Sequence, residues 1–166
     1  MPGLKDTMVS FVRKLLPPSL FELIKRILRK AKYYGTSYYC NICHSNLKHL
    51  KTIGIDIPVL SEKQVVGAGQ RKAQCPVCFS SDRTRLLQLF LTEKTTLYQN
   101  PVKLLHIAPE APLRIILQNQ KNIEYLTADL MQEDVDVKMD LTDIQFPGDS
   151  FDCILCSHVL EHIPDD

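Results

Sequence analysis

The C-terminal part of the chain, from residue 101 onward, alternates short apolar runs with polar turns. Four of these runs have the length and composition of β-strands, and they span 102–107, 124–128, 135–139 and 151–157. An apolar segment from Leu113 to Gln118 follows the first run and predicts a helix, with Pro109 or Pro112 suited to its first position. Strands and helices that alternate in this way are typical of a parallel sheet. The pattern therefore predicts an α/β fold here.

The N-terminal part has the periodicity of an amphipathic helix. Its apolar set is Leu20, Phe21, Ile24, Ile27, Leu28 and Ala31, and its basic set is Lys25, Arg26, Arg29, Lys30 and Lys32. Ser19 and Glu22 form a capping box after Pro17-Pro18, which predicts that the helix starts there, and Gly35 predicts its end. A shorter apolar cluster, from Val9 to Leu16, predicts a preceding turn or two of helix.

Two interpretations of this amphipathic segment stay open. In the first, the helix packs on the body of the protein and its charges are solvated. In the second, residues 9–32 make a peripheral contact with an anionic membrane surface, where apolar burial and basic charge act together. No stretch has the uninterrupted apolar length of a membrane span, so the sequence excludes spanning.

Composition places the 166-residue chain among soluble globular proteins, with 45% hydrophobic and 23% charged residues and room for one domain or two small ones. The net charge of +1 is unevenly distributed. Residues 1–35 contain eight basic and two acidic side chains, a net charge of +6, and the remainder has a net charge of −5. This argues against a uniformly basic nucleic-acid binder, and Arg83 and Arg85 support phosphate or nucleic-acid binding only weakly.

All six cysteines fall into Cys-x-x-Cys units, which are Cys40/Cys43, Cys75/Cys78 and Cys153/Cys156. The N-terminus lacks the features of a signal peptide, so we expect a reducing, cytoplasmic setting, in which such pairs bind metal or carry redox chemistry. The first two pairs have the spacing of zinc knuckles. They are therefore predicted to bind one structural zinc ion through Cys40, Cys43, Cys75 and Cys78.

Two observations bear on this predicted zinc site. Glycine often follows the second cysteine of a knuckle, but His44 and Phe79 stand at these positions, and buried free thiols or a redox pair are the alternative. The third pair is predicted to stay outside the site, because residues three apart on a strand point to opposite faces of the sheet. Cys153 and Cys156 are therefore expected to be small buried core residues.

Five segments of the C-terminal part resemble the ordered motifs of class I S-adenosylmethionine-dependent methyltransferases, in particular methyltransferase type 11. They are Leu104–Glu110, Tyr125–Asp129, Asp140–Phe146, Ser150–Ile154 and His158–Ile163. The resemblance implies a Rossmann-like, doubly wound parallel sheet, S-adenosylmethionine as cofactor, and methyl transfer to a small-molecule, glycan, lipid or other acceptor that the sequence does not identify. The preceding segment, Cys75 to Leu91, resembles a zinc ribbon found ahead of some members of the family.

The resemblance also implies cofactor contacts at the carboxyl ends of the strands, where ligands of open α/β sheets bind. The implied residues are His106, Ala108, Pro109, Glu110, Asp129, Asp140, Leu141, Ser157, His158 and Val159. In the family pattern the first four face the methionine part of the cofactor, and Asp129 accepts its ribose hydroxyls. The next two residues flank the adenine, and the last three line the methyl-donor pocket. His158 is the one side chain predicted as a catalytic base.

The first motif departs from the family pattern, which places several glycines there so that the backbone can approach the cofactor. Ala108, Glu110 and Pro112 stand at those places, and Glu110 is predicted to pair with the ammonium group of the cofactor. After the fourth strand, His158 and His162 are four residues apart, so a helix there would bring them to one face and allow a second metal site.

The chain is thus predicted to comprise a basic amphipathic leader (1–35), a zinc-ribbon-like module with a connecting helix (36–100) and a partial methyltransferase domain (101–166). The fourth strand would be a bare sheet edge, which predicts the N-terminal part of a longer enzyme that is inactive alone. The alternative is a zinc-ribbon adaptor module with a degenerate, non-catalytic nucleotide fold. Oligomeric state is left open.

Overall fold

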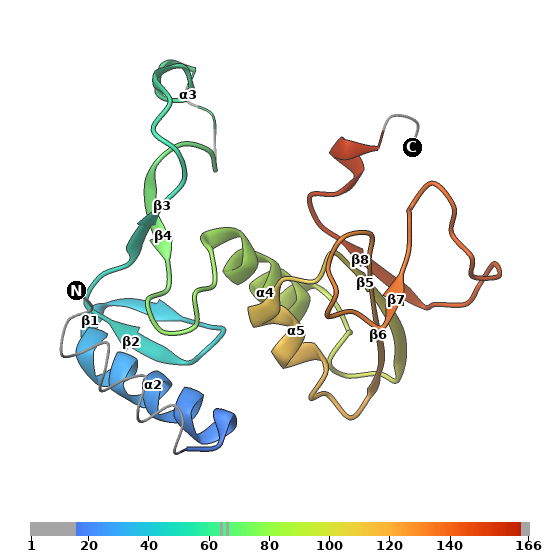
Figure 1. Ribbon diagram of the computed structural model, residues 1–166, viewed down its shortest axis with the longest axis horizontal. Coiled ribbons are helices and arrows are strands. Elements are labelled where there is room, and N and C mark those ends of the chain that lie inside the picture. Colours follow the sequence, from blue (N-terminus) through green and yellow to red (C-terminus); the bar gives the residue numbers. More distant parts are fainter. Residues whose placement is uncertain (1–15, 64, 66, 164–166) are drawn as a thin grey trace. The chain divides into compact units, whose positions relative to one another are not determined.

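The computed structural model describes residues 16–63, 65 and 67–163, so the apolar cluster predicted at 9–16 lies outside the described residues except for Leu16 (Figure 1). The chain divides into two compact units, Met1–Ser81 and Asp82–Asp166. This division differs from the predicted one. The amphipathic helix shares a unit with the cysteine-rich module, and the predicted connecting helix shares a unit with the parallel sheet, because each helix packs on that neighbour.

Helix α2 (Pro18–Tyr33) begins with Pro18, and proline is favourable there because the first helical amide has no partner within the helix. The predicted capping box is wrong. Pro17 rather than Ser19 precedes the helix, no side chain caps this end, and the Phe21 amide bonds to the Pro17 carbonyl at 3.0 Å. The helix stops before Gly35 because the backbone already becomes extended at Tyr34. None of the helices in the described residues combines the length and apolar character needed to span a bilayer.

Two small antiparallel sheets complete the described part of the first unit. Strand β1 (Tyr34–Cys40) pairs with β2 (Ser45–Leu47), and β3 (Lys51–Ile53) pairs with β4 (Arg71–Gln74). The short helix α3 (Pro58–Glu62) lies between β3 and β4, at the tip of that hairpin in Figure 1. Sheets of two short strands bury little apolar surface, so this unit depends on a further source of stability.

The second unit contains a parallel sheet with the strand order β7-β6-β5-β8. Its strands are β5 (Val102–Ile107), β6 (Ile123–Asp129), β7 (Val137–Lys138) and β8 (Cys153–Cys156). Helix α4 (Asp82–Lys94) precedes β5, and helix α5 (Ala111–Leu117) connects β5 to β6. This order is that of the first half of a Rossmann-like sheet, which confirms the predicted fold and all four predicted strands.

Two apolar clusters cover the two faces of this sheet. Leu104 packs with residues of α4 and α5, which Figure 1 shows on the same side of the sheet, and Leu105 and Ile107 belong to the second cluster. Cys153 packs against the first cluster and Cys156 against the second, which confirms that these two cysteines face opposite sides. Both are half-buried, however, and not fully buried as expected.

Asp152 joins the fourth strand to the first. Its Oδ2 accepts a hydrogen bond from the Lys103 amide at 2.8 Å, and its own amide donates to the Lys103 carbonyl at 3.0 Å. These bonds continue the pairing of β8 with β5 by one residue. Asp152 therefore has a structural role at the start of the strand.

Candidate functional site

The four cysteines predicted as metal ligands converge in the first unit. Cys40 ends β1 and Cys43 lies in the turn to β2, while Cys75 and Cys78 belong to the turn after β4. Their sulfur atoms all lie within 4.8 Å of one another, and the Cys40–Cys78 and Cys43–Cys75 sulfur distances are both 3.7 Å. A tetrahedral ion with sulfur ligands at about 2.3 Å separates those ligands by about 3.8 Å. The cluster therefore has the dimensions of a four-sulfur metal site.

The residue after each knuckle adopts the backbone conformation that glycine favours. His44 has φ of 51° and Phe79 has φ of 63°, which costs a residue with a Cβ about 1–2 kcal/mol. Local contacts hold both residues in place. The His44 Nδ1 lies 2.8 Å from the Tyr39 hydroxyl, and the Phe79 ring centroid lies 5.0 Å from the Arg29 guanidinium carbon and 5.4 Å from the Lys51 amine. The expected glycine geometry is thus present without glycine.

Packing and charge inside the cluster favour a bound cation. Cys40, Cys43 and Cys75 are buried, and Cys78 is half-buried. A hydrogen bond with Cys43 is the main cause that holds the pKa of the Cys40 thiol far below its ordinary value, and a hydrogen bond with Cys40 raises the pKa of Cys75. Four thiols this close do not all ionise on their own, because each thiolate opposes the next. A cation bound among them removes that opposition, so the four residues can hold a metal.

The cofactor residues implied by the resemblance lie mainly at the carboxyl edge of the parallel sheet. Strand β5 has β6 on one side and β8 on the other, so Ala108, Asp129 and Ser157 all lie where these strands end. Ala108 has φ of 50° and His158 has φ of 57°. Positive φ is uncommon for residues other than glycine, and such conformations cluster at functional sites. Two of them, one after β5 and one after the adjacent β8, mark this edge as the candidate binding site.

Asp129 and Asp140 are held in turns by their own loops. Asp129 Oδ1 accepts from the amides of Met131 and Gln132 at 2.6 and 2.8 Å, and its Oδ2 accepts from Gln132 Nε2 at 3.0 Å. Asp140 Oδ1 accepts from the Thr142 amide and hydroxyl at 2.9 and 2.8 Å, and the amide bond is the main cause that lowers the Asp140 pKa. These hydrogen bonds orient both carboxylates, and the lowered pKa of Asp140 favours its ionised form.

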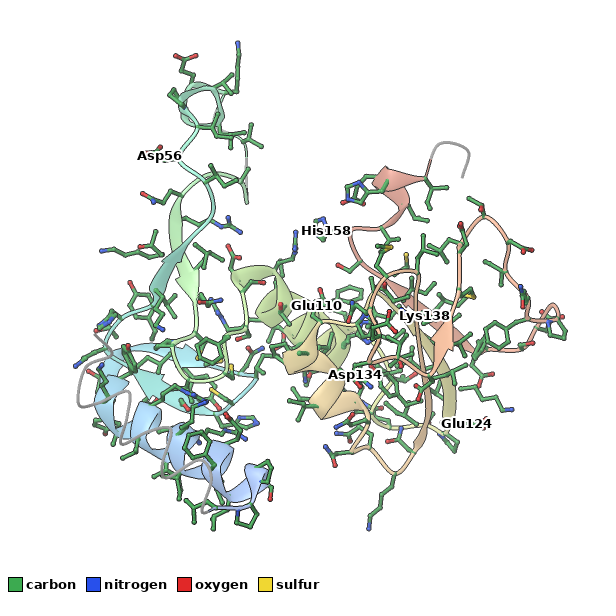
Figure 2. All side chains as sticks on the ribbon, viewed as in Figure 1. Asp56, Glu110, Glu124, Asp134, Lys138 and His158 are labelled. Atoms are coloured by element: carbon green, nitrogen blue, oxygen red, sulfur yellow. The ribbon has the colours of Figure 1, made fainter. Side chains whose placement is uncertain are left out.

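His106 and Glu110 face the protein interior. The His106 side chain is fully buried, with Nδ1 2.7 Å from the Tyr125 hydroxyl and Nε2 3.5 Å from Glu110 Oε2. Burial raises the pKa of Glu110 and the neighbouring His106 lowers it, with a net pKa below the ordinary value. Figure 2 labels Glu110, which directly precedes α5. The predicted contact with the cofactor ammonium group would require Glu110 to turn away from His106.

The remaining predicted residues divide between the core and the surface. Pro109 is buried, and Leu141 and Val159 pack against the apolar cluster that contains Leu105 and Ile107. Ser157 is half-buried. The exposed His158, labelled in Figure 2, has its Nδ1 3.1 Å from Glu161 Oε1.

The histidines after the fourth strand do not form a metal site in this structure. In the described residues that follow β8, Leu160–His162 form a 3₁₀ turn and His158 precedes it in a left-handed conformation, so no helix brings His158 and His162 to one face. Among the described residues, the four-cysteine cluster alone brings together three or more potential metal ligands. The condition for a second metal site at His158 and His162, a helix after the fourth strand, is therefore not met.

Two polar residues near this edge were not predicted from the sequence. Tyr125 bonds to His106, and Asp136 Oδ2 accepts from the Thr127 amide and hydroxyl at 2.9 and 2.6 Å. The composition of the strands contained a signal for these residues. Parallel strands buried on both faces are usually almost wholly apolar, so His106, Tyr125 and Thr127 in two such strands indicate a buried polar network.

One open hollow lies at the opposite edge of the sheet. It is lined by residues at the amino ends of three strands, among them Val102, Ile123 and Asp152. It contains none of the residues predicted to bind the cofactor, and parallel α/β sheets bind ligands at the carboxyl edge. We therefore assign it no function.

Comparison with protein families finds a match for part of the α/β unit. Residues 111–166, about a third of the chain, match the family model described as a methyltransferase domain. Over these residues the match supports the resemblance to class I S-adenosylmethionine-dependent methyltransferases. The match begins after the first strand and its loop, so the glycine-poor segment around Ala108 and the cysteine knuckles lie outside it. Searches of curated proteins and of solved structures gave no match.

Proposed function

We propose that the methyltransferase domain binds S-adenosylmethionine at the carboxyl edge of its sheet and transfers the cofactor's methyl group to an acceptor. The observation that carries this proposal is the convergence of a methyltransferase family match with the strand order β7-β6-β5-β8. That order places the ends of β5, β6 and β8 side by side. S-adenosylmethionine supplies a methyl group on a positively charged sulfur, and the acidic side chains at this edge match that charge.

Asp129 is the residue best suited to hold the ribose. A carboxylate has about four acceptor positions, and hydrogen bonds from Met131 and Gln132 occupy three of those on Asp129. The fourth is available, and a further one is freed when the exposed Gln132 side chain turns away. Two hydroxyl groups can then be accepted without disturbing the loop backbone. Asp140 and Leu141, next to each other after β7, would lie along the adenine.

Catalysis in this arrangement depends chiefly on position. Methyl transfer needs the acceptor held in line with the methyl carbon, so fixed geometry at the edge supplies much of the effect. The backbone at Ala108 and His158 has unusual conformations just after the adjacent strands β5 and β8. His158 is the candidate base, because its imidazole is exposed at this edge and its Nδ1 is oriented by Glu161.

Calorimetric titration of the chain with S-adenosylmethionine tests this proposal. We expect saturable binding, and we expect Asp129→Asn to weaken it by roughly tenfold to a hundredfold, because an amide cannot accept both hydroxyls. The amide oxygen of Asn can still accept the loop amides, so the fold should persist. Asp149→Asn, at an exposed turn with φ of 61° that asparagine tolerates, is the matched control and should bind as the wild type does. A folded wild-type chain that binds no cofactor would contradict the proposal.

We infer that Cys40, Cys43, Cys75 and Cys78 bind a metal and that this metal is a structural zinc ion. The support is the sulfur geometry, with distances of 3.7 Å against about 3.8 Å for a tetrahedral zinc–thiolate site. Four protein ligands complete the coordination shell, so the ion would stabilise the fold of the unit without binding substrate. All six cysteines are free, which fits a reducing compartment, and we propose a cytoplasmic setting on that ground.

Mass spectrometry under native conditions tests the zinc assignment. The wild-type chain should carry one zinc ion, and Cys75→Ser should lose it, because three thiolates and an alcohol bind zinc far more weakly. Cys153→Ser is the matched control, since Cys153 lies in the parallel sheet of the other unit, and it should retain the ion. A wild-type chain purified without any metal, or one that carries iron in place of zinc, would overturn the assignment.

A further inference from the structure

Helix α2 packs on its own unit through a face that the hydrophobic pattern did not identify. Phe21 is buried, the Arg29 Nε donates to the Val77 carbonyl at 3.1 Å, and the guanidinium of Arg29 lies over the Phe79 ring. A basic side chain and one aromatic ring therefore fix the orientation of the helix. The helix therefore packs on the body of the protein, as the first of the two interpretations states, but the charge of Arg29 is part of that contact and is not left in solvent.

The apolar stripe of α2 faces solvent. Five large aliphatic side chains lie along it, with the spacing i, i+3, i+4, i+7 and i+8 of one helix face. They are Leu20 (41% exposed), Leu23 (52%), Ile24 (37%), Ile27 (56%) and Leu28 (63%). Single exposed apolar residues are ordinary, but a continuous row of five on one helix is typical of an interaction site.

Basic residues border this stripe on both sides. Arg26 and Lys30 lie along the edge formed by Leu23 and Ile27, and Lys25 and Lys32 lie along the opposite edge, as the 3.6-residue turn of the helix requires. The unit Met1–Ser81 contains thirteen Lys and Arg against four Asp and Glu, a net charge of +9. An aliphatic row between two basic rows fits a surface that is apolar inside and anionic at its boundary.

We propose that α2 docks on an anionic lipid membrane, with its aliphatic stripe in the interface and its basic rows on the headgroups. Apolar burial and attraction of the lysine and arginine side chains to anionic lipid act on the same helix face. A nucleic acid binds through aromatic stacking and phosphate contacts, so bound nucleic acid would leave the five aliphatic side chains in water. A second copy of the chain would bring two sets of like charges together across the contact. An anionic membrane can bury the aliphatic stripe and pair with the basic rows at the same time.

Cosedimentation of the full chain with lipid vesicles tests this proposal. We expect binding to phosphatidylcholine vesicles that contain phosphatidylserine, and little binding to pure phosphatidylcholine. The double variant Ile27→Gln/Leu28→Gln should weaken binding by roughly tenfold or more, because both side chains are apolar and exposed. Arg26→Gln/Lys30→Gln should weaken it by about fivefold for each charge removed. Binding should fall as salt concentration rises.

Matched controls separate docking from misfolding. Ile55→Gln removes an apolar side chain that is 71% exposed but lies outside α2, and Lys72→Gln removes an exposed basic one, so neither should change vesicle binding. The stripe variant should keep the thermal stability of the wild type. A clear loss of stability would show that the stripe packs within the protein, and this would overturn the proposal.

Two further outcomes would overturn it. Equal binding to neutral and anionic vesicles, or no binding to either, contradicts a site built from both features. In one outcome, the chain does not bind vesicles but binds a single-stranded oligonucleotide, and this binding depends on Arg26 and Lys30 and not on Ile27 and Leu28. Such a result would assign the helix to nucleic acid. Self-association lost in the stripe variant, again without vesicle binding, would assign it to a second copy. Cofactor binding by the other unit does not enter any of these measurements.

Discussion

Ala108 adopts a left-handed backbone at the point where β5 ends, with φ of 50° and its amide bonded to the Ala128 carbonyl at 2.9 Å. The methyltransferase family commonly has glycine in this loop, because a missing Cβ relieves the backbone and lets a ligand approach it. The chain thus has the left-handed backbone conformation at a residue with a Cβ, which is strained there. The strain at Ala108 can therefore be measured as the change in the free energy of unfolding when this residue alone is substituted.

Ala108→Gly is expected to stabilise the protein slightly. Removing the Cβ relieves about 1–2 kcal/mol of strain, and the greater freedom of glycine in the unfolded chain offsets roughly 0.5–1 kcal/mol of that gain. Urea unfolding measures the difference. Ala31→Gly, in the right-handed backbone of α2, is the matched control and should destabilise by about 0.5–1 kcal/mol. Loss of stability in Ala108→Gly equal to that of the control would show that Ala108 is not strained.

Glu110 gives the folding stability a defined pH dependence. Burial is the largest single effect and raises its pKa, but His106, a backbone hydrogen bond and the charge of Arg83 together lower it below the value in the unfolded chain. The ionised form of Glu110 therefore stabilises the fold at pH values above the unfolded pKa. This contribution is lost as the pH falls through the folded pKa. We expect Glu110→Gln to be less stable than the wild type at pH 7 by roughly 1 kcal/mol, and the gap to narrow below about pH 4.

Unfolding curves over a series of pH values test this expectation for Glu110. Glu124→Gln is the control, because Glu124 is exposed and its Oε1 lies 3.4 Å from the Lys103 amine in a surface pair. Its effect should stay within about 0.5 kcal/mol at every pH. A stability gap for Glu110→Gln that stays constant or widens toward low pH would refute the role given to its charge.

At the scale of elements, the knuckle region depends on a close approach between two segments. A Cβ on Gly35 would lie 2.5 Å from the Cα of Lys48 and 2.6 Å from its amide nitrogen, and that amide bonds to the Tyr33 carbonyl at 2.9 Å. Gly35 therefore lets β1 start beside the residue that follows β2. Its predicted role as a helix stop is replaced by a packing role, since the helix has already ended at Tyr33.

Gly35→Ala should disturb this pairing. Backbone atoms cannot move aside as a flexible side chain can, so we expect a loss of stability of roughly 1–3 kcal/mol in thermal or urea unfolding. Gly148→Ala is the control, because a Cβ there meets nothing within 4 Å, and it should change stability by less than about 0.5 kcal/mol. Equal effects of the two substitutions would show that β1 and Lys48 do not approach this closely.

At the scale of the whole molecule, the two units differ in charge and in the source of their stability. Met1–Ser81 has a net charge of +9, and Asp82–Asp166 has seven basic and fifteen acidic residues, a net charge of −8. In the described residues, the second unit has apolar clusters on both faces of its sheet, whereas in the first unit the cysteine cluster joins the end of β1 and its turn to the turn after β4. The proposed zinc ion would therefore be the main support of the first unit.

Removal of the metal should accordingly affect one unit. In hydrogen exchange followed by mass spectrometry, a strong chelator should abolish protection in residues 34–81 of the full chain, because apolar burial there is too small to replace the ion. Protection in β5 and β6 should remain, since their cores contain no metal ligands. Equal loss of protection in both units, or no loss in either, would contradict this division.

The local pattern of the sequence determined much of the architecture. Strand β5 has the predicted bounds, the α/β alternation gave the parallel sheet, and the knuckle spacing identified four cysteines that converge. Such features depend on residues close together in the chain, where periodicity and turn chemistry act directly. The opposite directions of Cys153 and Cys156 followed in the same way from the alternation of side chains along a strand.

Tertiary structure decided what each residue faces. His106 and Glu110 point inward because a tyrosine from the neighbouring strand completes their network, and no local pattern pairs residue 106 with residue 125. The stripe of α2 is exposed because the helix is oriented by the buried Phe21 and by Arg29, which contacts the second knuckle some fifty residues along the chain. The opening pattern of apolar and polar positions thus determined which helices and strands form. Which helix face is buried depended on partners distant in sequence, because contacts between elements are made by specific side chains and not by average hydrophobicity.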